Sequence, residues 1–420
     1  MKLAPLLIGL ITSLSLVHAD DDDESSSTTA TSNRNPCSFS RTTITQSTGV
    51  QEINSCATLD GDITISGSEI EILDLPGIRQ LEGSLTVINS PTILNVNFLS
   101  LANITGALKM QNMTRLVNVQ LPALNISKDL QLVSLPSLEV LGLNSEMYSI
   151  EKVVLSDTAL SDINGFNGFE NIHNMNINNN KNITRLNFGN LKTVTENLIL
   201  SFNHDNAIVE MDELIWAANL TIQDVAGVSL KNLTNVNGSL SLSFNTFESL
   251  DLDSLTNVGT SLQIFANDDL TDLSVNNLTE ISGEFKMFNN TALEDMNNTF
   301  TSLRRVRGAV SITGVFETLE MPSLERVDGD FMMTSTDEDF NCDAFDELHD
   351  RGDIQGHNYE CAAQKSEAFS SDEVDSDDDS NGGSGGSGGS GSGNSSAGDK
   401  LFVPSVLLSI IVGILAINYV

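Results

Sequence analysis

Apolar and polar residues alternate in a short pattern that recurs along most of the chain. In one copy, residues 238–258, serines alternate with two leucines and further apolar residues follow at wider intervals. The apolar residues of this copy are Leu240, Leu242, Phe247, Leu250, Leu252, Leu255 and Val258. A period of two is typical of a β-strand with one buried face. Similar copies begin about every 22 residues from Gly61 to about Met333, which indicates a solenoid of stacked coils.

The rest of each copy predicts a turn and two short returning legs. The turn usually holds Asn, Asp or Ser, which tolerate left-handed backbone angles. We expect this role for Asn89, Asn112, Ser134, Asp157, Asn179, Asn203, Asn245, Asn267 and Asn289. Proline recurs at one phase of the legs, as in Leu121-Pro122, and argues against long helices there. The prediction is a mainly β protein, a right-handed β-solenoid of about 13 coils.

The two ends of the chain carry targeting signals. Residues 1–19 have Lys2, a short apolar run and a small-residue cleavage pattern ending at Ala19, which is typical of a secretory signal peptide. Residues 399–420 end in an apolar tail without basic residues after it, and they predict a GPI-attachment signal that is removed. We expect the anchor on Asn394. The alternatives are a tail-anchored helix or attachment at Ser392, Gly393, Ser395 or Ser396.

Between these signals the composition changes several times. The segment 20–36 is acidic and rich in Ser and Thr, and it predicts disorder. The expected order after it is an N-terminal cap with one or two strands at 37–60, solenoid repeats at 61–335, a C-terminal cap at 336–365, and an acidic then Gly/Ser-rich stalk at 366–398.

Four cysteines flank the repeats, Cys37 with Cys56 before them and Cys342 with Cys361 after them. An even number in two close pairs in a secreted chain predicts one disulfide at each end of the solenoid. A zinc site is the weaker alternative, because neither pair has Cys-x-x-Cys spacing. The disulfides would close the ends, where the core of a repeat array is otherwise exposed.

The chain also contains many acceptor sequences for N-linked glycans, Asn-x-Ser/Thr. In a secreted protein most exposed ones should carry glycan. The predicted glycosylation sites are Asn103, Asn112, Asn125, Asn182, Asn219, Asn232, Asn237, Asn277, Asn289 and Asn297.

The charge balance excludes some partners. With 20 Lys plus Arg against 57 Asp plus Glu, the formal net charge is -37. Binding to nucleic-acid phosphates needs clustered basic residues, so we expect no nucleic-acid partner. Electrostatic attachment to anionic lipid is disfavoured for the same reason.

These features together resemble a known family. The cysteine pair Cys37 and Cys56, the segment 56–65, the Gly-x-Leu-x-Leu copies, the Ser/Gly-rich stalk and the GPI tail are similar to those of fungal GPI-anchored cell-wall-organisation glycoproteins, which include sporulation-specific wall proteins. The resemblance implies a solenoid like receptor L-domains and leucine-rich repeats. It also implies a role in wall integrity or assembly, with a place at the outer face of the plasma membrane or in the cell wall.

Catalysis is the alternative to weigh, because polysaccharide lyases and hydrolases also use β-helices of this period. Such sites need clustered carboxylates, usually near a basic residue. The candidates are Asp205, Glu210, Asp212, Glu213, Asp268 and Asp269, with the basic cluster Arg304, Arg305 and Arg307. Carboxylates are abundant throughout this chain, and its histidines form no ligand pair such as His-Glu-x-x-His, so we expect neither catalysis nor a metal or cofactor.

Two further motifs have ordinary explanations. Arg351-Gly352-Asp353 matches the integrin-binding tripeptide, but three-residue matches are common by chance. Trp216 and Ile215 are expected to fill the core or a coil edge rather than form a sugar platform. The predicted function is that of a non-enzymatic GPI-anchored surface glycoprotein for cell-wall organisation, with wall polysaccharide or wall proteins as partners. An adhesion or ligand-binding receptor is the runner-up, and a β-helix enzyme comes third.

Overall fold

The computed structural model describes residues 35–144 and 149–363, all within the first of two compact units, Met1–Ser366. The predicted signal peptide, nearly all of the acidic N-terminal segment, the stalk, the GPI signal and Asn394 lie outside the described residues.

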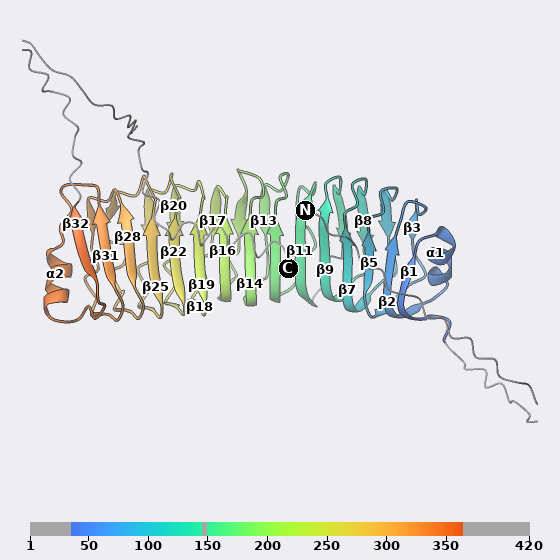
Figure 1. The fold of residues 1–420 in the computed structure, drawn as a ribbon, viewed down its shortest axis with the longest axis horizontal. Coiled ribbons are helices and arrows are strands. Elements are labelled where there is room, and N and C mark those ends of the chain that lie inside the picture. The colour runs from blue at the N-terminus through green and yellow to red at the C-terminus, as the bar shows by residue number, and fades with distance from the viewer. Residues whose placement is uncertain (1–34, 145–148, 364–420) are drawn as a thin grey trace, which may run out of the picture. The chain divides into compact units, whose positions relative to one another are not determined.

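The described residues form a parallel β-solenoid of about 13 turns. One long sheet runs through it, with a helix at each end (Figure 1). In chain order its strands are β1 (Ser38–Ile44), β2 (Thr58–Ser66), β4 (Gln80–Glu82), β5 (Leu85–Ile88), β7 (Asn103–Gln111), β9 (Ile126–Leu135), β11 (Ser149–Thr158), β12 (Asn171–Asn178), β14 (Thr193–Ser201), β16 (Trp216–Gln223), β18 (Asn235–Val236), β19 (Ser239–Ser243), β21 (Asn257–Val258), β22 (Ser261–Phe265), β24 (Glu280–Ile281), β25 (Glu284–Phe288), β27 (Arg305–Val306), β28 (Val310–Gly314), β30 (Arg326–Val327), β31 (Phe331–Ser335) and β32 (Tyr359–Ala363).

Shorter strands on the returning legs form four small parallel sheets, which we call the back sheets. They are β3 (Leu73–Asp74), β6 (Asn95–Asn97), β8 (Asn118–Leu121) and β10 (Val140–Leu143); β13 (Arg185–Asn187), β15 (Ile208–Glu210) and β17 (Gly227–Ser229); β20 (Ser249–Asp251) and β23 (Asp272–Ser274); and β26 (Asp295–Met296) and β29 (Thr318–Leu319).

The register of the long sheet stacks like residues on one another. Leu220 pairs with Leu240, Leu240 with Leu262, and Leu262 with Phe285, and all four side chains are fully buried. Because the inward positions of every coil repeat this arrangement, a single hydrophobic core runs through the described coils. The alternation in the sequence therefore predicted the buried face of the strands correctly.

Glycine opens several copies because neighbouring backbones approach closely there. A Cβ atom on Gly283 would lie 1.8 Å from the carbonyl oxygen of Thr260 in the preceding coil. Any side chain at this position would force the two coils apart.

The turn after the long strands differs from the prediction by one residue in three coils. Asn89, Asn112, Ser134, Asp157, Asn179 and Asn289 have positive φ, as expected. In the other three coils, however, the left-handed residue is Phe202, Phe244 or Ala266, each directly before the predicted asparagine. The reason is that the predicted asparagine itself lies at the next position, which is buried, and its side-chain amide is needed there for hydrogen bonds to buried groups.

That buried position holds an asparagine ladder between coils. Asn245 Nδ2 donates to Asn267 Oδ1 at 2.9 Å, and Asn267 Nδ2 donates to Asn290 Oδ1 at 3.0 Å. Asn267 also donates to the carbonyl oxygen of Leu242 at 3.1 Å. A second run joins Asn180 to Asn203 at 3.1 Å. The amides satisfy backbone groups that would otherwise be buried without partners where the chain turns.

Each end of the solenoid has a helix and a disulfide. Cys37 is bonded to Cys56 beside α1 (Ser47–Asn54), and Cys342 is bonded to Cys361 beside α2 (Asp343–Asp350). Both predicted pairings are confirmed. The N-terminal cap was expected to have one or two strands, and it contains β1 and the start of β2. Between them it also has the helix α1, which was not predicted because only Val50 and Ile53 of this helix point inward.

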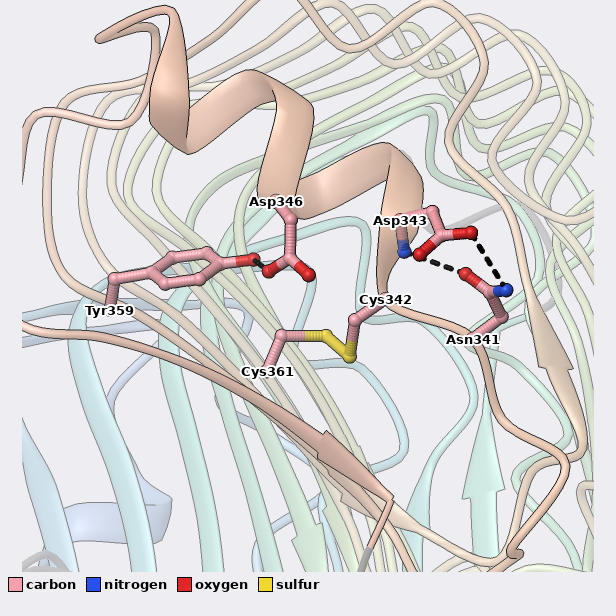
Figure 2. The surroundings of a disulfide bond; sticks show 6 residues. All are labelled: Asn341, Cys342, Asp343, Asp346, Tyr359 and Cys361. Carbon is pink, nitrogen blue, oxygen red and sulfur yellow. Dashed lines mark hydrogen bonds between the residues drawn. A yellow bond between two sulfur atoms is a disulfide. The ribbon is translucent and has the colours of Figure 1, made fainter.

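The C-terminal cap is tied to the last strand by more than its disulfide. Tyr359 of β32 donates its hydroxyl hydrogen to Asp346 Oδ1 of α2 at 2.6 Å (Figure 2). Its ring stacks on His349 with 4.1 Å between ring centroids. Burial, followed by the hydrogen bond to Asp346, raises the pKa of the Tyr359 phenol well above its ordinary value.

Candidate binding surface

The outer side of the long sheet has a central region that is nearly free of charge. Five of its strands, β12, β14, β16, β19 and β22, contain one formally charged residue between them, Glu196 in a bulge of β14. The outward positions that alternate with their buried residues define what we call the neutral face. Ten of them are partly exposed, namely Asn174, Asn176, Asn178, Asn197, Ile199, Asn219, Thr221, Ser239, Ser241 and Gln263, and four at the ends of strands are buried, namely Ser201, Gln223, Ser243 and Ser261.

The neutral face contrasts with the rest of this acidic chain. Strands on both sides of it carry charge at outward positions, with Lys152 on β11, and Glu284 and Lys286 on β25. Amides and hydroxyls on the face offer both hydrogen-bond donors and acceptors, and they repeat from coil to coil at a strand spacing of about 4.8 Å. Some bond to one another, as in Gln263 Nε2 to Ser261 Oγ at 3.0 Å.

An aromatic edge borders this face, where the strands end. It consists of Phe202 and, two coils further on, Phe244 with Phe288 and the buried Phe265; Asp224 occupies the equivalent position in the coil between Phe202 and Phe244. Phe265 stacks on Phe288 with centroids 4.8 Å apart, and Phe244 meets Phe265 edge-to-face at 5.5 Å. Phe244 is nevertheless 46% exposed and Phe202 is 41% exposed, so both present ring surface to solvent.

Phe202 and Phe244 are also in an unfavourable backbone conformation. Their φ angles are 53° and 57°, in the left-handed region where a bulky residue costs about 1–2 kcal/mol. Other coils place Asn, Asp or Ser at the same position, which avoids much of that cost. Exposed aromatic rings held in strained conformations are more typical of a binding function than of packing.

The predicted glycan acceptors lie mostly away from this surface. Asn219 is on the neutral face, where its side chain accepts from the Ser239 amide at 2.9 Å and donates to the Glu196 carbonyl at 3.1 Å. The other nine are outside the five strands that carry the face. Glycans at those nine sites would therefore be attached outside it.

The candidate catalytic carboxylates do not form one site. Glu210 forms an ion pair with Arg185 at 2.7 Å, and Asp212 forms one with Lys231 at 2.8 Å. Hydrogen bonds from Lys231 and Ser229 lower the pKa of Asp212, whereas a general acid needs a raised pKa. Asp205 and Asp269 each follow a ladder asparagine by two residues, in different coils. Asp268 and Glu213 are exposed. Within residues 35–144 and 149–363, no three His, Cys, Asp or Glu side chains are grouped to hold a metal.

The basic cluster is largely paired with acids. Arg307 bonds to Glu280, which lowers the pKa of Glu280, and Arg305 lies 3.5 Å from Asp328. Arg304 lines a shallow hollow beside them. In the tripeptide Arg351-Gly352-Asp353, the arginine and aspartate pair with each other at 3.0 Å.

Trp216 is half-buried at the start of β16 and its neighbour Ile215 is 46% exposed, as expected for a coil edge.

Sequence reasoning missed the neutral face and the aromatic edge. A signal for the latter was present, because Ser-Phe-Asn occurs at both 201–203 and 243–245. Among the described helices, none has the length and apolar character needed to cross a membrane.

Comparisons with known proteins place the chain in a family. It is 45% identical over 369 residues to a cell surface GPI-anchored protein, ECM33, of Candida albicans, covering 88% of this chain and 86% of that protein. It is 32% identical to sporulation-specific protein 2 of Saccharomyces cerevisiae, over 76% of this chain and 63% of that protein. It is 28% identical to protein ecm33 of Aspergillus fumigatus, over 79% and 81%.

No protein-family model matches the chain. No solved structure matches it either. The names of these relatives describe cell-surface and cell-wall proteins and no enzyme. The resemblance drawn from the cysteines, the repeats and the tail is thus confirmed: the chain belongs to the fungal family of GPI-anchored ECM33-type proteins of the cell surface and cell wall.

Proposed function

We propose that this protein organises the cell wall without catalysis, by binding an uncharged wall polysaccharide along its neutral face. The observation that carries the proposal is a face without charge on a chain of net charge -37. A neutral polymer can approach this face without Coulombic cost. Its hydroxyls both donate and accept hydrogen bonds, which matches the amides and hydroxyls of the face.

The aromatic edge supports the same ligand class. The C–H faces of sugar rings are apolar and pack on aromatic rings, so Phe202 and Phe244 could hold sugar units at the margin of the face. The strain at these two residues would then be the cost of presenting the rings. A linear polymer is favoured over a small sugar, because the face repeats its groups over five coils and is open along the sheet.

Cosedimentation tests the binding. The full chain, released from cells by phosphatidylinositol phospholipase C, is mixed with insoluble β-glucan or chitin at low and high salt. We expect binding that changes little with salt, because few charged groups take part. The variant Asn176→Glu/Ser241→Glu places two charges on the face and should bind at least about tenfold more weakly, a loss of about 1.4 kcal/mol.

The matched control is Thr246→Glu/Ser249→Glu, which adds the same charge at exposed positions outside the five strands. Equal binding by both variants, or binding abolished by salt, would refute a neutral-face ligand. Release of soluble sugar from the polymer would refute the non-enzymatic part. Separately, the wall role predicts that cells lacking the protein become sensitive to wall-perturbing dyes.

A further inference from the structure

A groove lies between the last back sheet and the C-terminal cap. Its volume is about 430 Å³, and one side is lined by Thr318 and Leu319 of β29 together with Met321. The cap provides Phe340 and Phe345, which are almost fully buried and form an apolar wall. Four acidic residues also line the groove, namely Glu317, Glu320, Asp339 and Asp343. The groove thus combines an apolar floor with strong hydrogen-bond acceptors.

Asn297 lines the groove and has an unusual side chain. Its Oδ1 is buried and has no hydrogen-bond partner in the described part of the chain. Its backbone N–H is held by Asp295 Oδ1 at 3.0 Å. Three other glycan acceptors, Asn182, Asn232 and Asn277, each donate Nδ2 to a carbonyl of an earlier coil, at 3.1, 2.7 and 2.7 Å. A buried acceptor without a donor destabilises the fold, so we expect Oδ1 of Asn297 to have a hydrogen-bond partner.

The sequence supplies one, because Asn297-Asn298-Thr299 is a glycan acceptor. We propose that Asn297 carries an N-linked glycan whose first N-acetylhexosamine lies in this groove. That sugar has an acetamido N–H and hydroxyls close to the linkage, which are the donors that Oδ1 lacks. Its acetamido methyl group can pack on the apolar floor, and its outer hydroxyls can donate to the acidic residues.

The attachment must precede folding of this coil. Thr299, whose hydroxyl the acceptor sequence requires, is only 3% exposed in the folded protein. In the transfer, Asn297 Nδ2 forms a bond to the anomeric carbon of a lipid-pyrophosphate-linked oligosaccharide. The bond from that carbon to the phosphate oxygen breaks, the lipid pyrophosphate leaves, and Nδ2 loses one proton. The cap then closes beside the sugar, which contacts both the last coils and the cap segment 339–345.

Glycopeptide mass spectrometry combined with an endoglycosidase tests the proposal on the protein secreted by its own cells. The enzyme cleaves within the inner sugars, so a sugar seated in the groove should be protected. We expect Asn297 to be occupied, and its glycan to be released from the native protein about tenfold or more slowly than that at the exposed Asn182. After denaturation, both should be released at equal rates.

Two results would overturn this inference, namely an unmodified Asn297 or equal release at both sites from the native protein. A second measurement compares Asn297→Gln with Asn182→Gln. The groove glycan predicts a lower melting temperature for Asn297→Gln alone, and an equal melting temperature for the two variants counts against it. Neither measurement depends on polysaccharide binding by the neutral face.

Discussion

The asparagine ladder makes a strong prediction about stability. Replacing Asn267 with Ala removes an amide that is fully buried. Its Oδ1 accepts from both the backbone N–H and Nδ2 of Asn245, at 3.1 and 2.9 Å, and its Nδ2 donates to the Leu242 carbonyl at 3.1 Å. Buried groups that lose their partners cost about 1–3 kcal/mol each. The expected destabilisation is therefore about 3–5 kcal/mol.

Urea unfolding followed by far-ultraviolet circular dichroism measures this change. Asn267→Asp keeps the shape but replaces the Nδ2 donor with an acceptor, so it should be nearly as destabilising. Asp268→Ala is the control, because Asp268 is exposed in the same corner and its substitution should change stability by less than about 0.5 kcal/mol. If Asn267→Ala and Asp268→Ala unfold at the same urea concentration, the ladder does not stabilise the coils.

Three further changes test other parts of the fold. Gly283→Ala should lower the unfolding midpoint by the equivalent of about 3 kcal/mol or more, because the added Cβ would collide with the Thr260 carbonyl. Gly227→Ala is the control and should have little effect, because a Cβ there lies 3.7 Å from its neighbours. The double variant Cys342→Ser/Cys361→Ser should have a free energy of unfolding lower by about 3 kcal/mol in the same assay. The parent protein should lose stability likewise only when a reducing agent is added. The pKa of Tyr359 is raised above 10.0 in the folded protein, so the unfolded chain loses the phenol proton at a lower pH than the folded chain does. The stability that this group contributes is therefore complete below pH 10.0 and falls as the pH rises further. In a pH series of melting temperatures, Tyr359→Phe should make this fall less steep.

Much of the architecture could be predicted from the sequence because each coil repeats the same physical requirements. The period of the sequence repeat predicted the solenoid, and the apolar alternation identified residues such as Leu240 and Leu262 as core. The turn was harder to place. Asparagine is favoured both at a left-handed position and at a buried position that needs an amide, so composition could not separate the two. Phe202 and Phe244 then occupy left-handed positions against their own propensity.

The binding surface depends on information that a linear pattern does not display. The neutral face becomes apparent only after the register places residues of five coils side by side, for example Asn176 beside Ile199 and Thr221 beside Ser241. The ion pairs that occupy the candidate carboxylates, such as Arg185 with Glu210, also join different coils. The helix α1 was missed because two inward apolar residues are too few to show a helical period.

The two capped ends have a consequence for the protein's behaviour at high local concentration. A parallel solenoid presents the same kind of strand edge at its first and last coils, so uncapped copies could add to one another head to tail without limit. The cap helices and disulfides stand at those ends, beside β1 and β32. In a crowded wall, the caps would therefore keep each molecule a separate unit of fixed length, and removal of a cap would favour filaments.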